Sequence, residues 1–320
     1  MGPVEFQVFK EIAMAKKVLA AVALCLFAVM AAGPVQAADK VRVALICKAM
    51  DSEFWTQVRD GAEKGAKEAG NVELTVLAPD REVNVQQQVQ IVEDVIVQGV
   101  DVICIAPCGS KELIPAMEAS AKAGIPVIVF DTDSPWDGKA AFIGTNEVKG
   151  GEEAGKYIAK ALNGTGTVAL IGGVMGHQTT IDRLQGCKNI LAGHPGIKIV
   201  AEQPANSERS LAMTVMENIL TSNPDLGAAF CINAEMAMGA LEAAEMDRSD
   251  VKVVGYYQEK SALQAIKDGR LAGLVSMSPF GMGELCVKNA VLLKEGKEIP
   301  KRIDTPMGFV SSENIGEWVK

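Results

Sequence analysis

Aromatic and charged side chains follow the first apolar run of the sequence, where they could bind a small molecule. Phe54 and Trp55 lie just beyond the run Val41–Cys47, and a pair of rings offers a flat apolar wall on which a ligand can stack. Lys48 follows the same run directly and brings three hydrogen-bond donors. One of the two rings can equally be a core residue. We predict that at least one ring lines a ligand pocket.

Polar side chains also end three later runs. Asp131 follows an apolar run with a carboxylate that can accept two hydroxyl hydrogen bonds, and Asn233 follows another with an amide that both donates and accepts. Tyr257 comes after Tyr256 at the end of a third run and offers a ring and a phenol. Asp131 can instead cap the turn after it, and Asn233 can cap a helix. We favour the ligand role for Asp131.

The motifs of catalysis and cofactor binding are missing from the chain. The cluster Gly172–Gly176 lacks the G-x-G-x-x-G spacing of dinucleotide loops, no Walker lysine follows it, and there is no G-x-S-x-G elbow. The two histidines, His177 and His194, lack the spacing of metal ligands. Neighbouring carboxylates such as Asp51 and Glu53 are typical of a solvated loop. We therefore expect no enzyme, with no catalytic residue, cofactor or metal.

The composition also indicates which partners and which cysteine chemistry to expect. The 320 residues include 31 Lys and Arg against 40 Asp and Glu, and no long basic run is present, which argues against nucleic acid as a partner. Of the seven cysteines, six lie beyond Cys25. Several of these sit inside apolar runs, where a free thiol behaves as a small buried hydrophobe. We predict mostly free thiols, with redox chemistry as the weaker alternative.

The first residues predict export. Lys16 and Lys17 precede an apolar run that continues to Ala32, and a small residue at Ala37 suits a signal peptidase. The run is shorter than the roughly 20 residues that cross a bilayer. We therefore expect a signal peptide over residues 1–37 that is cleaved near Ala37, and a periplasmic mature protein. Met14 is an alternative start.

Strand-like and helix-like patterns alternate through the rest of the chain. The expected strands are Val41–Cys47, Val72–Ala78, Val100–Ala106, Pro126–Asp131, Thr167–Gly173, Lys198–Glu202, Ala228–Asn233, Val251–Tyr257 and Leu271–Met277. Between them, Val85, Val89, Val92 and Ile96 form one helical face, with Asn84 as the expected cap. This alternation predicts an α/β fold with doubly wound parallel sheets, and the number of units predicts two lobes. Ligands bind such sheets beyond the carboxyl ends of the strands.

With these residues in view, the chain resembles the periplasmic sugar-binding proteins of the ribose/allose/galactose type, which are type I periplasmic binding proteins of ABC importers. The resemblance covers nearly all of the mature sequence. It is carried by Phe54-Trp55 with Asp60-Gly61-Ala62, Ile125-Pro126-Val127-Ile128 to Asp131, Gln203-Pro204-Ala205-Asn206, Asn233 to Leu241, and Val253-Val254-Gly255.

The resemblance implies two similar lobes joined by a three-crossing hinge, which close on a ligand. The N-terminal lobe would comprise residues 38–144 and 278–306, and the C-terminal lobe residues 145–277 and 307–320. The hinge would fall near Gly144–Asn146, Met277–Pro279 and Asp304–Met307.

The resemblance also implies which side chains contact the ligand. Phe54, Trp55, Asp131 and Asn233 match sugar contacts of the family, and Lys48 matches a lysine of its allose-binding branch. The whole predicted ligand-binding set is Lys48, Ser52, Phe54, Trp55, Asp131, Gln178, Asn233, Tyr257 and Met277.

The second lobe departs from the family pattern. A ligand-binding arginine is replaced by Ile181, an aromatic residue by Ser207, a carboxylate by Tyr257 and a glutamine by Met277. Each buried hydrogen bond left unmade costs about 1–3 kcal/mol, so ribose and allose should be poor ligands. We expect a ligand that is less polar at one end, such as a sugar alcohol, a deoxy sugar or a non-sugar heterocycle.

The leading prediction is an exported solute-binding protein that closes over one small carbohydrate-like molecule and delivers it to a membrane permease of an ABC importer. The alternative is the same fold binding a non-sugar molecule, nucleoside-like or a signal, for a chemoreceptor or sensor kinase. A nucleotide-dependent oxidoreductase lacks its phosphate loop here. Sugar-responsive repressors share the fold but carry a DNA-binding segment where this chain has its signal.

Overall fold

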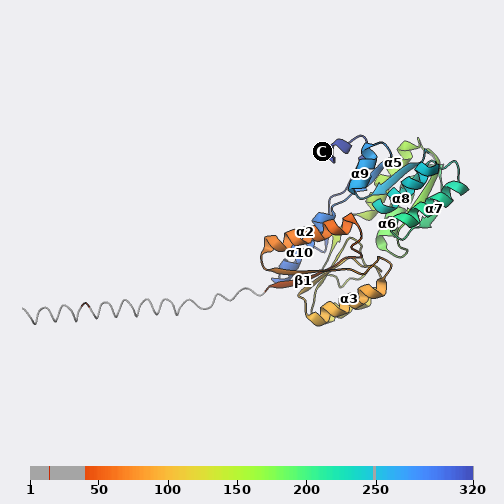
Figure 1. The fold of residues 1–320 in the computed structure, drawn as a ribbon. Coiled ribbons are helices and arrows are strands. Elements are labelled where there is room, and N and C mark those ends of the chain that lie inside the picture. Colours follow the sequence, from red (N-terminus) through yellow and green to blue (C-terminus); the bar gives the residue numbers. More distant parts are fainter. Residues whose placement is uncertain (1–13, 15–39, 248–249, 320) are drawn as a thin grey trace, which may run out of the picture. The chain divides into compact units, whose positions relative to one another are not determined.

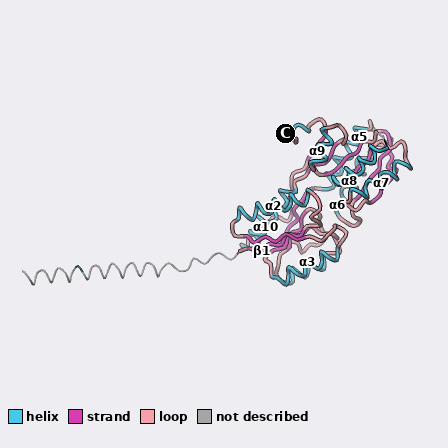
Figure 2. Tube along the Cα trace, in the orientation of Figure 1, coloured by secondary structure: helices cyan, strands magenta, loops and turns pink. Residues whose placement is uncertain are grey.

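Two six-stranded sheets organise the part of the chain that the computed structural model describes, which is Met14 and residues 40–247 and 250–319. Their strands form two separate groups in Figure 2. The predicted signal peptide, Met14 apart, lies outside these residues. Among the helices of the described part, none combines the length and the apolar character that a membrane span requires.

The first sheet has the strand order β11-β5-β4-β3-β1-β2, and all of its pairs are parallel. Its strands are β1 (Val41–Ile46), β2 (Val72–Leu77), β3 (Val102–Ile105), β4 (Val127–Phe130), β5 (Ala141–Gly144) and β11 (Arg302–Asp304). Its helices are α2 (Glu53–Ala69), α3 (Val85–Gln98), α4 (Ile114–Lys122) and α10 (Pro279–Lys294). Figure 1 shows α2 and α10 on one side of β1 and α3 on the other. Cover on both faces explains why β3 and β4 are apolar throughout.

The second sheet has the order β12-β10-β9-β8-β6-β7, with only the β10–β12 pair antiparallel. Its strands are β6 (Thr165–Gly172), β7 (Gly196–Pro204), β8 (Ala228–Cys231), β9 (Lys252–Tyr256), β10 (Gly273–Ser276) and β12 (Gly308–Ser311). The helices packed on it are α5 (Glu147–Ala161), α6 (Gln178–Leu191), α7 (Arg209–Ser222) and α8 (Ala234–Asp247), and α9 (Lys260–Lys267) packs against α8. The short helix η1 (Ile315–Glu317) follows β12.

The chain passes between the two sheets three times. It leaves the first sheet after β5, returns after β10 to form α10, and leaves again between β11 and β12. The first and third passages lie side by side, because the hydroxyl groups of Thr145 and Thr305 are 3.2 Å apart. Both threonines are buried.

Helix α2 packs closely on α10 because glycines replace bulkier residues where they cross. A Cβ at Gly61 would overlap the backbone carbonyl of Phe280, and one at Gly283 would overlap that of Val58. Val58, Ala62 and Gly65 of α2 are also buried at this crossing. The glycines are therefore required by packing.

Most elements agree with the sequence pattern, and the exceptions are local. All nine expected strands are present, with ends shifted by one or two residues. The three short strands β5, β11 and β12 were not among the expected nine. Arg302–Asp304 has no apolar run that would predict a strand. Asn84 is the N-cap residue of α3, as predicted, but its side chain makes no capping bond and donates instead to Gln87 (3.4 Å). The six described cysteines are free and buried, as predicted.

Candidate ligand-binding site

A cavity of about 590 Å³ is lined by residues from both sheets. The first sheet contributes the loops after β1, β2 and β4. The second contributes the loops after β7, β8, β9 and β10 and the beginning of α6. These loops all follow the carboxyl ends of parallel strands, where ligands bind in open α/β sheets. The cavity is thus the strongest candidate for a binding site in the described part of the chain.

The cavity brings together all but one of the predicted site residues. Its lining includes Lys48, Ser52, Phe54, Trp55, Asp131, Asn233, Tyr257 and Met277. Gln178 is the exception, because it lines a separate hollow with Asp133 and Arg302. The Gln178 side chain donates to Asp182 one turn along α6 (2.7 Å), and its backbone N–H donates to the Ser110 hydroxyl (3.1 Å). Gln178 thus links the two halves outside the cavity.

A buried ion pair forms the floor of the cavity on the side of the first sheet. Lys48 Nζ lies 3.0 Å from Asp131 Oδ2, and both side chains are about 95% buried. Burial alone would raise the pKa of Asp131, but the charges of Lys48 and Arg183 outweigh it and the pKa is lowered. Burial likewise opposes the charge of Lys48, yet Asp131 raises its pKa. Both groups are therefore charged at neutral pH.

Gln88 holds the loop after β1, which carries Lys48, against the loop after β3. Its Nε2 donates to the carbonyl groups of Cys47 (3.0 Å) and Ala106 (2.8 Å). Its Oε1 accepts from the backbone N–H of Cys108 (2.7 Å). The Gln88 side chain is fully buried on α3, so it satisfies three backbone groups where β1 and β3 end. Gln88 is a positioning residue for Lys48.

Aromatic side chains form one wall. The Phe54 ring meets the rings of Trp55 (4.9 Å, 87°) and Tyr257 (5.2 Å, 88°) edge to face. Trp55 is only 3% exposed and Phe54 is half-buried, so Phe54 offers more surface to a ligand. The buried Tyr257 hydroxyl has no hydrogen-bond partner among the described residues. A ligand acceptor or donor could satisfy it.

Two of these side chains reach the cavity through unusual backbone conformations. Asp131 follows β4 with φ 58°, and Tyr257 follows β9 with φ 77°. The left-handed region is costly for residues with a Cβ, by about 1–3 kcal/mol, and such residues cluster at functional sites. The conformation turns each side chain out of its strand at the edge of the cavity.

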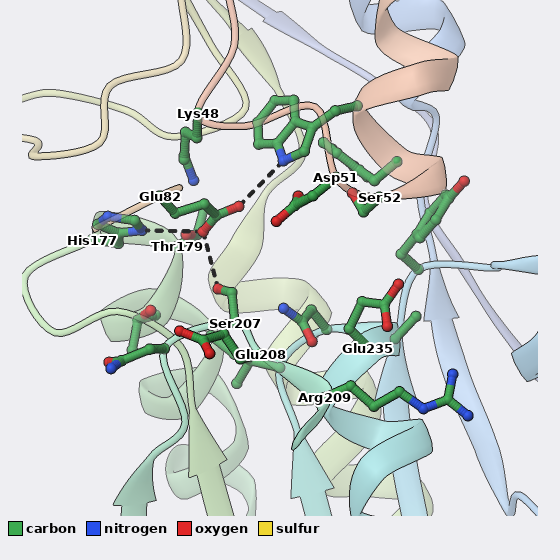
Figure 3. A pocket seen from close by; sticks show the side chains of 18 of the residues that line it. Lys48, Asp51, Ser52, Glu82, His177, Thr179, Ser207, Glu208, Arg209 and Glu235 are labelled. Carbon is green, nitrogen blue, oxygen red and sulfur yellow. Dashed lines mark hydrogen bonds and ion pairs between the residues drawn. The ribbon is translucent and has the colours of Figure 1, made fainter. Parts of the chain in front are cut away.

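Glu82 connects the two sides of the cavity (Figure 3). It lies in the loop between β2 and α3, and its carboxylate accepts from Trp55 Nε1 (3.2 Å) on its own side and from the Ser207 hydroxyl (3.0 Å) on the other. Nδ1 of His177, at the start of α6, is 3.8 Å from the same carboxylate. Arg81, next to Glu82, pairs with Glu208 across the gap. These contacts join the two lobes over the cavity.

Arg183 supplies a guanidinium on the side of the second sheet. It is 7% exposed and lines the cavity, while Nε donates to Glu147 (2.6 Å) and Nη1 to the Ile232 carbonyl (2.8 Å). Glu147 also accepts from the Tyr256 hydroxyl (2.7 Å). Burial disfavours the charge of Arg183, but Glu147 keeps its pKa above the ordinary value. The sequence analysis placed the family's ligand-binding arginine at Ile181 and did not identify Arg183. Ile181 is 50% exposed and lies outside the lining.

Asn233 combines the two roles that the sequence left open. Its Oδ1 accepts from the backbone N–H of Met236 (2.8 Å) and so caps α8. The residue also lines the cavity, and its amide nitrogen makes no hydrogen bond within the described residues. The cap fixes the side chain and leaves one donor for a ligand.

Glu82 and His177 were missed by the sequence reasoning for different reasons. The strand-end rule applies to the loop after Val72–Ala78, which was not considered, and it would have pointed to Glu82. His177 has no neighbouring motif, so no sequence signal identifies it. No group of three or more potential metal ligands is found within the described residues.

The comparisons with known proteins decide the family. A family model described as a periplasmic binding protein domain matches residues 43–298. The chain belongs to this family. It is 34% identical over 265 residues to the ribose import binding protein of Bacillus subtilis, covering 83% of this chain and 85% of that protein. It is 31% identical over 315 residues to the D-ribose/D-allose-binding protein of Pseudomonas aeruginosa, covering 93% and 98%.

Solved structures of periplasmic binding proteins agree. An ABC transporter solute binding protein from Bacillus halodurans with bound myo-inositol matches with a TM-score of 0.82 and 30% identity, over 88% of this chain and 97% of that one. Another from Actinobacillus succinogenes, with bound D-allose, has a TM-score of 0.82 and 31% identity, over 87% and 100%. The predicted family and two-lobed α/β fold are confirmed. The relatives are binding proteins of transport, in line with the expectation that the protein is no enzyme.

Proposed function

We propose that this protein is the exported solute-binding protein of an ABC importer and that it closes over one small carbohydrate-like ligand. The observation that carries the proposal is the cavity between the two sheets. It combines a buried ion pair, an aromatic wall and two buried polar atoms, Tyr257 Oη and His177 Nε2, that have no hydrogen-bond partner in the part of the chain that the structure describes. Relatives that share the fold at about 30% identity hold D-allose or myo-inositol.

Binding and closure are coupled in this proposal. The contacts of Glu82 with Ser207 and of Arg81 with Glu208 form only when the lobes approach. A ligand that touches both lobes stabilises the closed arrangement by its differential contacts. The three strand passages at residues 145–146, 277–278 and 305–307 are the natural hinge. The lobes would then comprise residues 38–144 with 278–306, and 145–277 with 307–320.

The second lobe favours a ligand that is less polar at one end. Met277 and Tyr257 line the cavity where sugar-binding relatives are expected to carry polar groups, and Met277 Sδ lies 3.9 Å from Arg183 Nη2. An aldose with hydroxyl groups all round would leave bonds unmade there, at about 1–3 kcal/mol each. We expect ribose and allose to bind weakly in comparison with a sugar alcohol or deoxy sugar.

Export and delivery complete the proposal. The signal peptide is removed near Ala37, the mature protein works in the periplasm, and the closed form docks on the membrane permease of the importer. Presentation of the ligand to a chemoreceptor or sensor kinase is a compatible second role.

The test is a ligand screen by thermal unfolding, followed by calorimetry on wild type and two variants. Trp55→Ala and Asp131→Ala should each weaken binding by at least about 1 kcal/mol. Trp136→Phe is the control, because Trp136 packs in a separate core cluster on the other face of the first sheet. Unchanged affinity in both cavity variants would show that the ligand binds elsewhere. The absence of any response to a broad panel of sugars, polyols and nucleosides would contradict the proposed function.

A further inference from the structure

The charges around the cavity do not balance. The four cations that line it, Lys48, Arg81, Arg183 and Arg209, are each paired with a carboxylate. Four lining carboxylates form no ion pair with a lysine or arginine of the described residues: Asp51, Glu82, Glu235 and Glu259. The lining therefore carries an excess of negative charge that its own cations do not neutralise.

His177 does not supply the missing charge. Its Nδ1 lies 3.8 Å from Glu82, but the side chain is only 2% exposed. Burial and then the nearby Lys48 lower the pKa of His177 to about 4, although Glu82 opposes the shift. The imidazole is thus neutral at pH 7, and its buried Nε2 has no partner among the described residues. The charge of Glu82 remains, although hydrogen bonds from Trp55 and Ser207 satisfy its oxygens.

Asp51 and Glu235 face the same open space from opposite sides (Figure 3). Asp51 follows β1 in the first lobe, and Glu235 lies in the first turn of α8 in the second. Burial, and then Glu82, raise the pKa of Asp51; burial, Glu259 and also Asp51 itself raise the pKa of Glu235. Closure therefore brings like charges together in a partly dry site.

A neutral sugar cannot compensate for this arrangement. Its hydroxyl groups can donate hydrogen bonds to carboxylates but bring no positive charge, so the repulsion persists. A protonated amine would offset the charge and donate up to three hydrogen bonds. The rings of Phe54 and Tyr257 border the same cavity, and aromatic faces attract ammonium groups.

We propose that the ligand is a polyhydroxylated molecule that carries a protonated amine, such as an amino sugar or an aminocyclitol, with its ammonium group held between Asp51 and Glu235. The hydroxyl groups then face the Lys48–Asp131 pair and the unpartnered Tyr257 hydroxyl. This inference rests on the proposed function, because it names the ligand class of that same cavity.

Calorimetry with matched pairs of probes tests the inference at pH 7 and low salt. The pairs are myo-inositol with an inosamine, D-glucose with D-glucosamine, and D-galactose with D-galactosamine. We expect at least one amine to bind 10-fold or more tightly than its hydroxyl counterpart. The preference should shrink as salt rises, because the attraction is electrostatic.

Variants locate the charge. Asp51→Asn and Glu235→Gln should each weaken binding of that amine by about 5-fold or more and lower its preference over the neutral counterpart by at least the same factor, because each removes one of the charges that attract the ammonium group. Neither carboxylate forms a hydrogen bond or ion pair with another described residue that the variant would lose, and thermal unfolding verifies that both variants are folded. Glu73→Gln removes one charge from an exposed position on β2 and should change neither affinity.

The outcomes separate this inference from the proposed function. Tighter binding of the neutral member in every pair, or an amine preference that survives both cavity variants, refutes the amine and leaves a sugar-binding function standing. Failure of all three amines to bind refutes the amine, whereas the proposed function is contradicted only if the broad panel of sugars, polyols and nucleosides also gives no response.

Discussion

Removing the ammonium group of Lys48 should destabilise the protein because it leaves the charge of Asp131 buried without its partner. At the observed separation of 3.0 Å and an effective dielectric constant of about 20, the Coulomb attraction is roughly 5 kcal/mol. Desolvation of both groups offsets much of it, and breaking a buried pair costs about 3–5 kcal/mol. Arg183 and the Thr132 hydroxyl still stabilise Asp131, so we expect Lys48→Met to cost about 3 kcal/mol.

The same pair predicts how stability depends on pH. The pKa of Asp131 is lowered in the folded protein, so its contribution is present above the unfolded value near 3.9 and is lost as the pH falls through the folded pKa. The pKa of Lys48 is raised, so its contribution is present below about 10.4 and is lost as the pH rises through the folded pKa. The pair therefore stabilises the fold fully between about pH 4 and pH 10.

A double-mutant cycle in urea measures the coupling. Asp131→Asn should also be destabilising, whereas Lys48→Met with Asp131→Asn should lose less than the two single changes added together, with a coupling of about 3 kcal/mol. The exposed pair of Lys64 and Glu68, 2.7 Å apart on α2, serves as the control and should show no measurable coupling. Additive effects at Lys48 and Asp131 would refute the reasoning.

Three further predictions concern the supports of the site. Gln88→Leu leaves three buried backbone groups unpaired and should lower the free energy of unfolding, measured by urea titration, by about 2–4 kcal/mol. Gln90→Leu, at an exposed position on the same helix, should lower it far less. Equal losses in the two variants would contradict the role of Gln88. Gly150→Ala places a Cβ against the Tyr256 hydroxyl and should lower the free energy of unfolding by about 1–2 kcal/mol in the same assay. Gly316→Ala is the control, because its Cβ meets open space. A higher free energy of unfolding for Gly150→Ala would show that the helix propensity of alanine outweighs the steric overlap. The six buried thiols should resist maleimide until the protein is denatured. Burial keeps the reagent away from them, and it also raises the pKa of the thiols of Cys47, Cys108, Cys187, Cys231 and Cys286. Fast labelling of the native protein would disprove their burial.

The sequence predicts the architecture well because parallel strands covered on both faces leave a strong signal. Runs such as Val102–Ile105 and Val127–Phe130 are apolar at every position, and each is buried at every position in the fold. The short strand Arg302–Asp304 has no such signal. It pairs with β5 at the edge of the first sheet, and this contact between segments far apart in the sequence depends on tertiary structure.

The candidate site was only partly predictable from the sequence. The rule that ligands bind beyond strand ends leads to Lys48 and Asp131, which are far apart in sequence and form one ion pair. Arg183 could not be found in the same way, because it lies inside α6 and does not directly follow a strand. The packing of α6 on α5 decides which face of α6 meets the cavity. Position 181, two residues earlier, lies about 200° away around the helix, which explains why Ile181 is exposed.

The most direct test of the central claim is mass spectrometry of the small molecules released when the purified protein is denatured. The account predicts one small polyhydroxylated compound in near-stoichiometric amount from the wild type, and its loss from Asp131→Ala and Trp55→Ala variants purified in parallel. Retention of the same compound by both variants, or release of a compound without hydroxyl groups, would contradict a binding site between the two sheets for a carbohydrate-like ligand.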